Sequence, residues 1–388
     1  MSHEHNSGTT APPRRVSRFL ATTLGLMGAL HLYIGWRLLP DLGLNGAGWT
    51  VGILLLCVSA VMIPFGMASR FFIRPTELAD RIHWLGALLM GLFSSLLVLT
   101  LLRDIALLLM PAAWRHDSAL AIVALAGLVT LIGYINARRI PRVAHVAVPI
   151  AGLPAPLHGF TIAQITDLHV GPTIKQAYVT GVVSRLNALQ PDLIAMTGDL
   201  VDGDVEGLRP HVGPLAGMRA RHGVFAVTGN HEYYSGAAQW VAEYERLGMR
   251  VLMNEHAVIE HDGAALVVAG VTDFSAGKFD SDQASDPVRA LAGSPAGVVP
   301  TILLAHQPRS APAAEQAGFD LQLSGHTHGG QFWPWSLFVP LQQPFTAGLH
   351  RLGRLWIYTS RGTGYWGPPK RFGAPSEITL LRLEPAAE

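Results

Sequence analysis

Two kinds of hydrophobic pattern divide the chain near residue 140. Before residue 137 the apolar residues form long, nearly uninterrupted runs, whereas from about residue 158 they occur in short runs separated by polar segments. A helix that crosses a bilayer needs roughly 20 apolar residues, while short runs rich in β-branched residues are typical of buried strands. The pattern therefore predicts an all-α membrane region followed by an α/β domain.

The first region contains four stretches that are long enough for transmembrane helices. We expect these spans at about 19–36, 49–69, 84–110 and 118–135. Residues 1–143 then form the membrane region, and residues 144–157, rich in proline and alanine, are expected to be a linker. The catalytic domain is expected to occupy residues 158–388.

Arginines near the span ends predict the orientation. Most of them fall on one side of the expected bilayer: Arg14, Arg15, Arg18, Arg70, Arg74, Arg81, Arg138, Arg139 and Arg142. Loops rich in Lys and Arg stay in the cytoplasm, so we expect an integral protein of a bacterial inner membrane with both termini and the catalytic domain in the cytoplasm. Residues 14–20 loosely resemble a twin-arginine export signal, which leaves the opposite orientation open.

Composition narrows the classes of function. Charged residues make up 14% of the chain, well below the roughly 25% of an ordinary soluble domain. A formal net charge of +1 gives no basic surface for nucleic acid. Arg103 and Asp104 lie in an apolar run; we favour adjacent charges that reach the membrane boundary over a functional pair.

Polar side chains follow five apolar segments of the second region. The segments 160–166, 192–197, 223–228, 301–305 and 320–324 are predicted strands, and each ends at a short run with metal-binding residues. In an α/β sheet such residues gather at the carboxyl edge of the strands. We therefore expect one site there. Its candidate ligands are Asp167, His169, Asp199, Asn230, His306, His326 and His328.

The donors of this set indicate the kind of metal. Carboxylate, imidazole and amide groups together suit Mn, Fe, Zn or Co better than Ca or Mg. A single ion rarely needs more than six ligands, and seven donors are enough for two ions that share one carboxylate. We therefore expect two divalent cations.

The ordered runs Asp167-Leu168-His169, Gly198-Asp199, Gly229-Asn230-His231-Glu232, Ala305-His306 and Gly325-His326-Thr327-His328 resemble the calcineurin-like metallophosphoesterase family. The similarity covers about residues 158–388, and residues 360–362 and 377–378 look like its membrane-associated, YkuE-type branch. The resemblance implies two mixed β-sheets sandwiched between helices. It also implies manganese as the favoured metal, and a ligand assignment: Asp167, His169 and His328 for one ion, Asn230, His306 and His326 for the other, and Asp199 as the bridge.

The resemblance also implies a mechanism. Two cations lower the pKa of a bridging water, and the resulting hydroxide attacks phosphorus in line. The residue equivalent to His231 protonates the leaving oxygen or stabilises the transition state. We expect Asp202 and Glu232 to accept hydrogen bonds from ligand histidines, with exposed surface positions as the alternative.

These expectations define a hydrolase of a phosphodiester or a pyrophosphate, acting on a phosphate ester that is lipid-linked, such as UDP-2,3-diacylglucosamine. Alternatives are a phosphatase or phosphodiesterase of soluble substrates, and a non-catalytic membrane sensor with a phosphoesterase fold. The aromatic residues Phe332, Trp333, Trp335 and Phe338 either contact membrane lipid or pack over the sheet edge. No protein partner is inferred.

Overall fold

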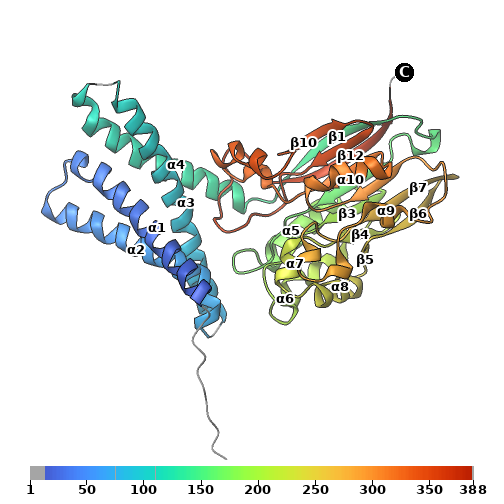
Figure 1. Cartoon of the computed structure of the whole chain (residues 1–388), viewed down its shortest axis with the longest axis horizontal. Helices are drawn as coiled ribbons and strands as arrows, with labels where there is room; N and C mark the ends of the chain where they lie inside the picture. Colours follow the sequence, from blue (N-terminus) through green and yellow to red (C-terminus); the bar gives the residue numbers. More distant parts are fainter. Residues whose placement is uncertain (1–13, 75, 110, 387–388) are drawn as a thin grey trace, which may run out of the picture. The chain divides into compact units, whose positions relative to one another are not determined.

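The computed structural model describes residues 14–74, 76–109 and 111–386. It divides into two compact units, Met1–Leu128 and Val129–Glu388, which we call the helical unit and, after the catalytic domain expected from the sequence, the catalytic unit (Figure 1). The side chains of Arg14, Arg15 and Arg18 lie outside the described residues. The helical unit is all α, and the catalytic unit is α/β with two mixed sheets.

The long helices of the first region follow the apolar runs. They are α1 (Arg14–Leu38), α2 (Gly46–Phe72), α3 (Thr76–Leu107) and α4 (Arg115–Arg138), with short 3-10 turns at Pro40–Leu42 and Ala112–Trp114. Three segments are long and apolar enough to cross a membrane: Gly46–Phe72, Thr76–Leu107 and Ala112–Arg138. Three of the four predicted spans are thus candidates, and the first, about 19–36, is not confirmed.

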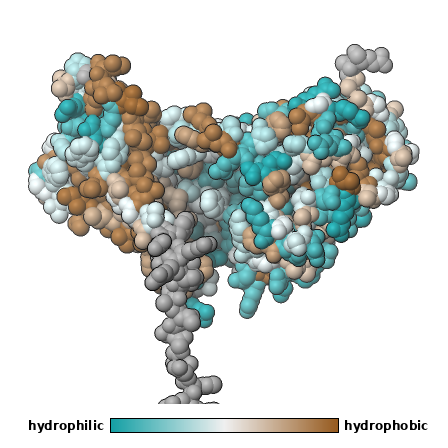
Figure 2. Space-filling view, in the orientation of Figure 1, coloured by the Kyte–Doolittle hydropathy of each residue, from teal (hydrophilic) through white to brown (hydrophobic). Residues whose placement is uncertain are grey.

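Glycines allow α2 and α3 to pack closely. A Cβ atom on Gly86 would lie 2.7 Å from the carbonyl oxygen of Met62, and one on Gly66 would lie 3.0 Å from the Cα of Gly86. Helices in lipid associate through such small residues because lipid tails supply no hydrophobic drive between helices. Contact with lipid would also account for the exposed apolar side chains of these helices, and the helical unit shows large brown areas in Figure 2.

Charged groups of the helical unit pair between segments. The Arg103 side chain is 2% exposed and donates to Asp41, while Asp104 accepts from Arg37 at 2.8 Å. Arg103 also donates to Ser118 at 2.8 Å. The expectation that Arg103 and Asp104 simply reach the boundary is therefore incomplete. Successive helical residues point about 100° apart, so each finds a different partner.

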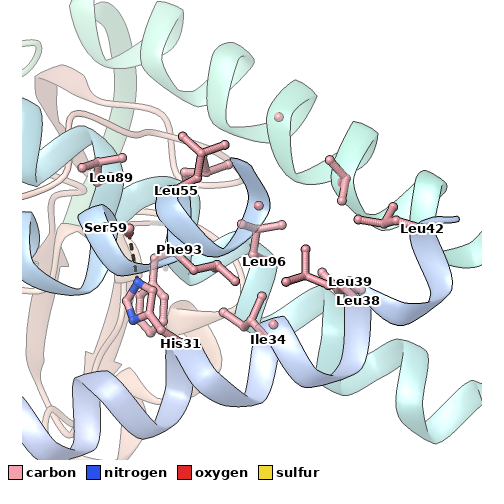
Figure 3. Close-up of a pocket in the computed structure, with 16 residues that line it drawn as sticks. His31, Ile34, Leu38, Leu39, Leu42, Leu55, Ser59, Leu89, Phe93 and Leu96 are labelled. Atoms are coloured by element: carbon pink, nitrogen blue, oxygen red, sulfur yellow. Dashed lines mark hydrogen bonds between the residues drawn. The ribbon is translucent and has the colours of Figure 1, made fainter. Parts of the chain in front are cut away.

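A cavity of about 360 Å³ opens among α1, α2, α3 and α4 of the helical unit and is lined almost wholly by apolar side chains (Figure 3). His31 and Ser59 are its polar exceptions. The His31 Nδ1 lies 2.8 Å from the Met27 carbonyl and its Nε2 lies 2.9 Å from the Ser59 hydroxyl. Because the carbonyl can only accept, Nδ1 donates and Nε2 accepts. The ring also stacks on Phe93 at 4.3 Å, so both nitrogens have a structural role.

The catalytic unit contains two six-stranded sheets, with strand orders β1-β12-β2-β3-β4-β5 and β10-β11-β9-β8-β7-β6. Parallel pairs β2·β3, β3·β4, β7·β8 and β8·β9 lie at the centres, and antiparallel pairs β12·β2, β6·β7 and β10·β11 make both sheets mixed. The strands are β1 (Arg142–Ile150), β2 (Thr161–Ile165), β3 (Leu193–Thr197), β4 (Val224–Val227), β5 (Arg250–Val251), β6 (Glu255–His261), β7 (Ala264–Gly270), β8 (Thr301–Leu304), β9 (Leu321–Ser324), β10 (Gly348–Leu352), β11 (Leu355–Thr359) and β12 (Glu377–Pro385).

Helices cover the outer faces of the sheets. They are α5 (Gln176–Asn187), α6 (Val205–Val212), α7 (Asn230–Tyr234), α8 (Ala237–Arg246), α9 (Pro287–Leu291) and α10 (Ala311–Ala317). The alternation along β3 shows the layers: Leu193 and Ala195 pack between the sheets, whereas Ile194 and Met196 pack in a separate cluster with residues of α5, α6 and α8. The α/β domain with two mixed sheets is therefore as expected.

The stretch expected to be a linker contains regular structure. Residues 144–150 belong to β1, which pairs in parallel with β12 along its whole length, and Ala155–Leu157 is a 3-10 turn. Val148 and Ile150 are buried in the core between the sheets. The proline and alanine content predicts an open connection, yet Pro149 lies in β1 at the edge of its sheet, and an edge strand tolerates proline.

Candidate metal centre

The seven candidate ligands lie at the carboxyl ends of five strands, shared between the two sheets. Asp167 and His169 follow β2, Asp199 follows β3, and Asn230 is the first residue of α7 after β4. From the second sheet, His306 follows β8, and His326 and His328 follow β9. The structure brings six of them into two groups whose ligand atoms lie within 4.8 Å of one another: Asp167, His169 and His328, and Asp199, His306 and His326.

In the first group two imidazole nitrogens meet beside a carboxylate. His169 Nε2 and His328 Nε2 are 3.0 Å apart, and His328 Nε2 lies 3.4 Å from Asp167 Oδ1. His169 Nδ1 lies 3.0 Å from Asp202 Oδ1, so this nitrogen donates to the carboxylate and Nε2 keeps its lone pair for a ligand. All three residues are buried.

The second group has the same character. His306 Nδ1 lies 2.7 Å from the Thr197 carbonyl, which can only accept, so His306 Nε2 is the atom that faces Asp199 Oδ2 at 3.1 Å and His326 Nδ1 at 3.2 Å. A nitrogen lone pair and a carboxylate oxygen that face each other repel, so a cation, either a proton or a metal ion, must lie between the two atoms. Burial lowers the pKa of His326 to about 3, so that ring is neutral and has a lone pair to offer.

Asn230 and Asp199 complete the donor set. The Asn230 Oδ1 atom is buried and has no hydrogen-bond partner among the described residues, which for a buried amide oxygen is unfavourable by about 1–3 kcal/mol. Burial opposes both shifts, but the pairing of His306 with Asp199 holds the pKa of Asp199 well below its usual range and raises the pKa of His306 well above its own, so Asp199 is anionic and, without a metal ion, a proton lies between the two. Anionic oxygen, neutral imidazole and an unsatisfied amide oxygen fit divalent transition metals.

Backbone conformation supports the same conclusion. Asp167, His169, Asp199, His326 and His328 all have φ between 52° and 70°, in the left-handed region. Non-glycine residues rarely adopt this region, and each costs of the order of 1–3 kcal/mol. Such residues gather at functional sites, where the surrounding structure holds side chains that ordinary strand ends would direct elsewhere.

Two glycines that precede candidate ligands have no room for a side chain, because a carboxylate from another loop approaches each of them closely. A Cβ atom on Gly229 would lie 2.2 Å from Asp199 Oδ1, and one on Gly325 would lie 2.2 Å from Asp167 Oδ2. Any side chain at these two positions would displace a carboxylate. The glycines therefore allow the loops of different strands to meet at one point.

His231 and Asp202 lie beside both groups. Asp202 Oδ1 is 2.6 Å from His231 Nδ1 as well as 3.0 Å from His169 Nδ1, and His231 Nε2 is 3.9 Å from Asp199 Oδ2. Burial lowers the pKa of His231, but its hydrogen bond to Asp202 and the charge of Asp199 together raise it to about 9. His231 is thus a protonated imidazole, and the exposed rings of Tyr234 and Trp366 lie 5.3 and 5.8 Å from its ring.

Glu232 has a different environment from the one expected. It is fully buried and accepts hydrogen bonds from the main-chain N–H groups of Asp199, Leu200 and Gly229, at 2.7–3.0 Å, and from the Tyr244 hydroxyl. It therefore holds the loop that carries Asp199 rather than orienting a histidine. A buried glutamate with main-chain partners leaves no periodic signal in the sequence.

Arg371 is a neighbour of the site that sequence reasoning missed. Its guanidinium is buried, lies 2.9 Å from His328 Nδ1, and donates to the carbonyls of His328, Arg361 and Gly364. Main-chain carbonyl oxygens, rather than a carboxylate, accept its hydrogen bonds and stabilise its positive charge. Arg371 lies 43 residues after His328 in a run with no metal-binding residue, and no spacing rule could have linked the two.

Comparisons with known proteins agree with this geometry. Residues 160–330 match the model of the calcineurin-like phosphoesterase family. The chain is 39% identical over 269 residues to a transmembrane protein with metallophosphoesterase domain from Bos taurus, covering 66% of this chain and 60% of that protein. It is 30% identical to an uncharacterized metallophosphoesterase from Campylobacter jejuni, covering 94% of this chain and 98% of that protein. It is also 30% identical to the uncharacterized metallophosphoesterase YkuE of Bacillus subtilis, covering 60% and 82%.

The two sheets and the cluster of histidines and carboxylates at their shared edge define an α/β protein with a candidate metal centre. The chain belongs to the calcineurin-like phosphoesterase family, which confirms the resemblance carried by its ordered runs. It spans about 60% of the length of the Bos taurus relative.

Proposed function

We propose that the protein is a membrane-anchored, metal-dependent phosphoric ester hydrolase with a dinuclear centre. The observation that carries this proposal is the pair of ligand groups, Asp167-His169-His328 and Asp199-His306-His326, together with the orphaned Oδ1 of Asn230. Protons alone leave Asn230 Oδ1 unsatisfied, because none of the residues that the structure describes donates a hydrogen bond to it. Two divalent cations, with manganese favoured, would satisfy all of these donors.

We assign the ligands by their positions. Asp167, His169 and His328 would hold one cation, and Asn230, His306 and His326 the other. Asp199 is the proposed bridge, since its Oδ2 faces His306 while its main-chain carbonyl accepts from the His169 N–H at 3.2 Å. When bound, the cations would supply positive charge for the phosphoryl oxygens and would lower the pKa of bound water.

His231 is the proposed proton donor. Its Nδ1 is held by Asp202, so its Nε2 is the atom that reaches toward the site, 3.9 Å from Asp199 Oδ2. A histidine in this position would protonate the oxygen of the leaving group, a contribution of typically about 10²- to 10⁴-fold. Asp202 would keep the ring charged and oriented until the proton is transferred.

The proposed substrate is a phosphodiester or pyrophosphate that is linked to a lipid, such as UDP-2,3-diacylglucosamine. Three candidate membrane spans in the same chain support this choice, because they keep the catalytic unit close to lipid. The exposed aromatic rings of Tyr234 and Trp366 beside His231 would accept an apolar or ring-bearing group next to the scissile phosphate.

We further propose that the catalytic unit faces the cytoplasm of a bacterial inner membrane. The proposal rests on the arginines that flank the candidate spans. Arg70 and Arg74 lie at the end of α2 and just after it, Arg81 lies in the first turns of α3, and Arg138 closes α4. Loops with such residues are retained in the cytoplasm.

The test is turnover by the detergent-purified full chain, reconstituted with Mn²⁺, on bis-p-nitrophenyl phosphate and on a UDP-linked diacyl lipid. We expect metal-dependent hydrolysis of both substrates, with the lipid preferred, and loss of both activities in Asp199→Ala. Hydrolysis of the soluble ester alone would indicate an enzyme of soluble substrates that the spans only localise. Binding of metal without hydrolysis of either substrate would contradict the proposal and favour a membrane sensor.

A further inference from the structure

An apolar surface segment follows the last ligand run. Between Trp333 and Leu341 the chain has no charged residue, and five large apolar side chains there are exposed: Trp333 by 42%, Trp335 by 41%, Leu337 by 68%, Phe338 by 52% and Leu341 by 81%. Two 3-10 turns, Trp335–Leu337 and Val339–Leu341, form this stretch, which we call the 333–341 segment. The surface over it is brown in Figure 2. Packing over the sheet edge, the alternative considered from the sequence, applies to Phe332, which is buried, but does not describe the exposed Trp333, Trp335 and Phe338.

The segment is attached firmly to a neighbouring loop, residues 366–373. The Trp333 N–H donates to the Phe372 carbonyl at 2.8 Å, and the Lys370 ammonium lies 4.9 Å from the centre of the Phe332 ring. Gln331 donates to the carbonyls of Trp366 and Pro368 and accepts from the Trp366 N–H. The apolar side chains are therefore presented from a fixed base.

The 366–373 loop is in turn attached to the end of α4, whose residues from Val129 onward belong to the catalytic unit. The Arg371 N–H donates to the Gly133 carbonyl at 2.8 Å, and the Asn136 side chain donates to the Arg371 carbonyl at 3.2 Å. A Cβ atom on Gly133 would lie 2.6 Å from Lys370 Cγ, so the loop contacts the helix backbone directly.

These contacts place the 366–373 loop at a defined distance from the end of the candidate span. Gly133 lies within the candidate span Ala112–Arg138, five residues before its end. At 1.5 Å per residue, the 366–373 loop therefore contacts the span about 7 Å from its end. That depth corresponds to the headgroup region and the outer part of the hydrocarbon, where tryptophan is enriched.

We propose that the 333–341 segment inserts into the interface of the bilayer that the candidate spans cross. The occupant of this surface is membrane lipid: the segment is apolar, uncharged and rich in tryptophan, and it is continuous, through residues 366–373, with the end of a spanning helix. Insertion of such a segment is driven by burial of apolar area in the interface.

Insertion would place the metal centre close to lipid headgroups, because Gln331, which begins the attachment, is only three residues after His328. A lipid-linked phosphate could then reach the site without leaving the bilayer. This consequence rests on the proposed function, whereas insertion itself does not.

Depth measurement on the full chain in lipid nanodiscs tests the insertion. The chain has one cysteine, Cys57, so Cys57→Ser provides a background for single spin labels at Leu337→Cys and Leu341→Cys. Val288→Cys on α9, where the side chain is 66% exposed, is the matched control. We expect labels at 337 and 341 to collide more with oxygen than with a water-soluble nickel chelate, and the label at 288 to show the reverse.

Two outcomes would overturn the proposal. One is a nickel preference at 337 and 341 equal to that at 288, which would place the segment in water. The other is dipolar broadening between labels at 337, which would show that a second copy of the chain covers the surface. Because the depth measurement needs no catalysis, failure of the hydrolase proposal leaves its outcome unchanged.

A kinetic experiment then tests whether insertion gives a lipid-linked substrate access to the site. In the double variant Leu337→Ser and Leu341→Ser, we expect turnover of a phospholipid-embedded ester in nanodiscs to fall about tenfold while turnover of bis-p-nitrophenyl phosphate stays unchanged. Equal turnover of the embedded ester in the variant and the wild type would contradict the link between insertion and substrate access.

Discussion

Buried polar side chains have different partners in the two units. In the helical unit donors meet acceptors: Arg103 meets Asp41, Arg37 meets Asp104, and His31 meets a hydroxyl and a carbonyl. At the edge of the two sheets, imidazoles and carboxylates crowd together, and the buried Asn230 Oδ1 has no hydrogen-bond partner among the described residues. Histidine nitrogens lie 3.0 and 3.2 Å from one another, and His306 Nε2 lies 3.1 Å from Asp199 Oδ2.

This difference separates structural polar groups from binding groups. A buried pair that satisfies itself stabilises one packing arrangement and needs nothing more. A buried cluster of imidazoles, carboxylates and an unsatisfied amide oxygen gains free energy when a metal ion enters it, because each unsatisfied group costs free energy. The catalytic unit tolerates such a cluster because its many paired strands and three apolar cores hold the loops in place.

The largest expected effect comes from removing the charge at the centre of the cluster. In Asp199→Asn we expect both cations to be lost and hydrolysis to fall below detection, since the proposed bridge serves both ions. The loss in metal affinity should exceed the roughly 10- to 100-fold that removal of an outer partner costs. Metal content by mass spectrometry and turnover of bis-p-nitrophenyl phosphate measure the two effects.

Asp262→Asn is the matched control, because Asp262 is exposed by 57% and pairs with Arg221 outside the site. Its metal content and turnover should equal those of the wild type. Retention of two ions in Asp199→Asn would show that Asp199 is not the bridge.

His231→Ala should separate chemistry from metal binding. We expect turnover to fall by about 10²- to 10⁴-fold with metal content unchanged, because His231 contacts Asp202 and lies near Asp199 without belonging to the proposed ligand set. His145→Ala, an exposed position on β1, should have no effect. Loss of metal from the His231 variant would identify it as a ligand instead.

Asp202→Asn should have a smaller and mixed effect. Asp202 accepts from both His169 and His231, so its amide variant weakens one proposed ligand and the proposed proton donor together. We expect metal affinity to fall about 10- to 100-fold, with a drop in turnover that persists at saturating Mn²⁺. Complete recovery of turnover at high Mn²⁺ would show that Asp202 acts on His169 alone.

The sequence placed the candidate ligands at one sheet edge because each one follows a short apolar strand, often through a glycine. Asp167 and Asp199 are examples, and their strands β2 and β3 are neighbours in the sheet. The left-handed backbone at these residues was not predictable, since it results from contacts between loops of different strands. The role of Glu232 and the involvement of Arg371 were not predictable for the same reason, because their hydrogen-bond partners include main-chain atoms that are distant in sequence.

The membrane region was predictable at the level of spans but not of pairing. Apolar length alone identified Gly46–Phe72, Thr76–Leu107 and Ala112–Arg138. The pairing of Arg103 with Asp41 and of Asp104 with Arg37 depends on how separate segments of the helical unit meet. Hydropathy contains no information about that arrangement.

The smallest expected effect on catalysis comes from the helical unit, where it would be accompanied by a clear effect on stability. Arg103→Met removes a buried guanidinium that donates to Asp41, Ser118 and the carbonyls of Arg37 and Arg115. Breaking such a pair costs about 3–5 kcal/mol when both partners are buried, and we expect less here because the Asp41 side chain is 21% exposed. The thermal midpoint of the detergent-solubilised protein should fall, while metal content and turnover below that midpoint stay at wild-type values. The double variant Arg103→Met and Asp41→Asn should recover part of the midpoint, because it no longer leaves a carboxylate without its partner. A loss of metal in the single variant would show that the polar network of the helical unit, like the cluster at the sheet edge, contributes to binding.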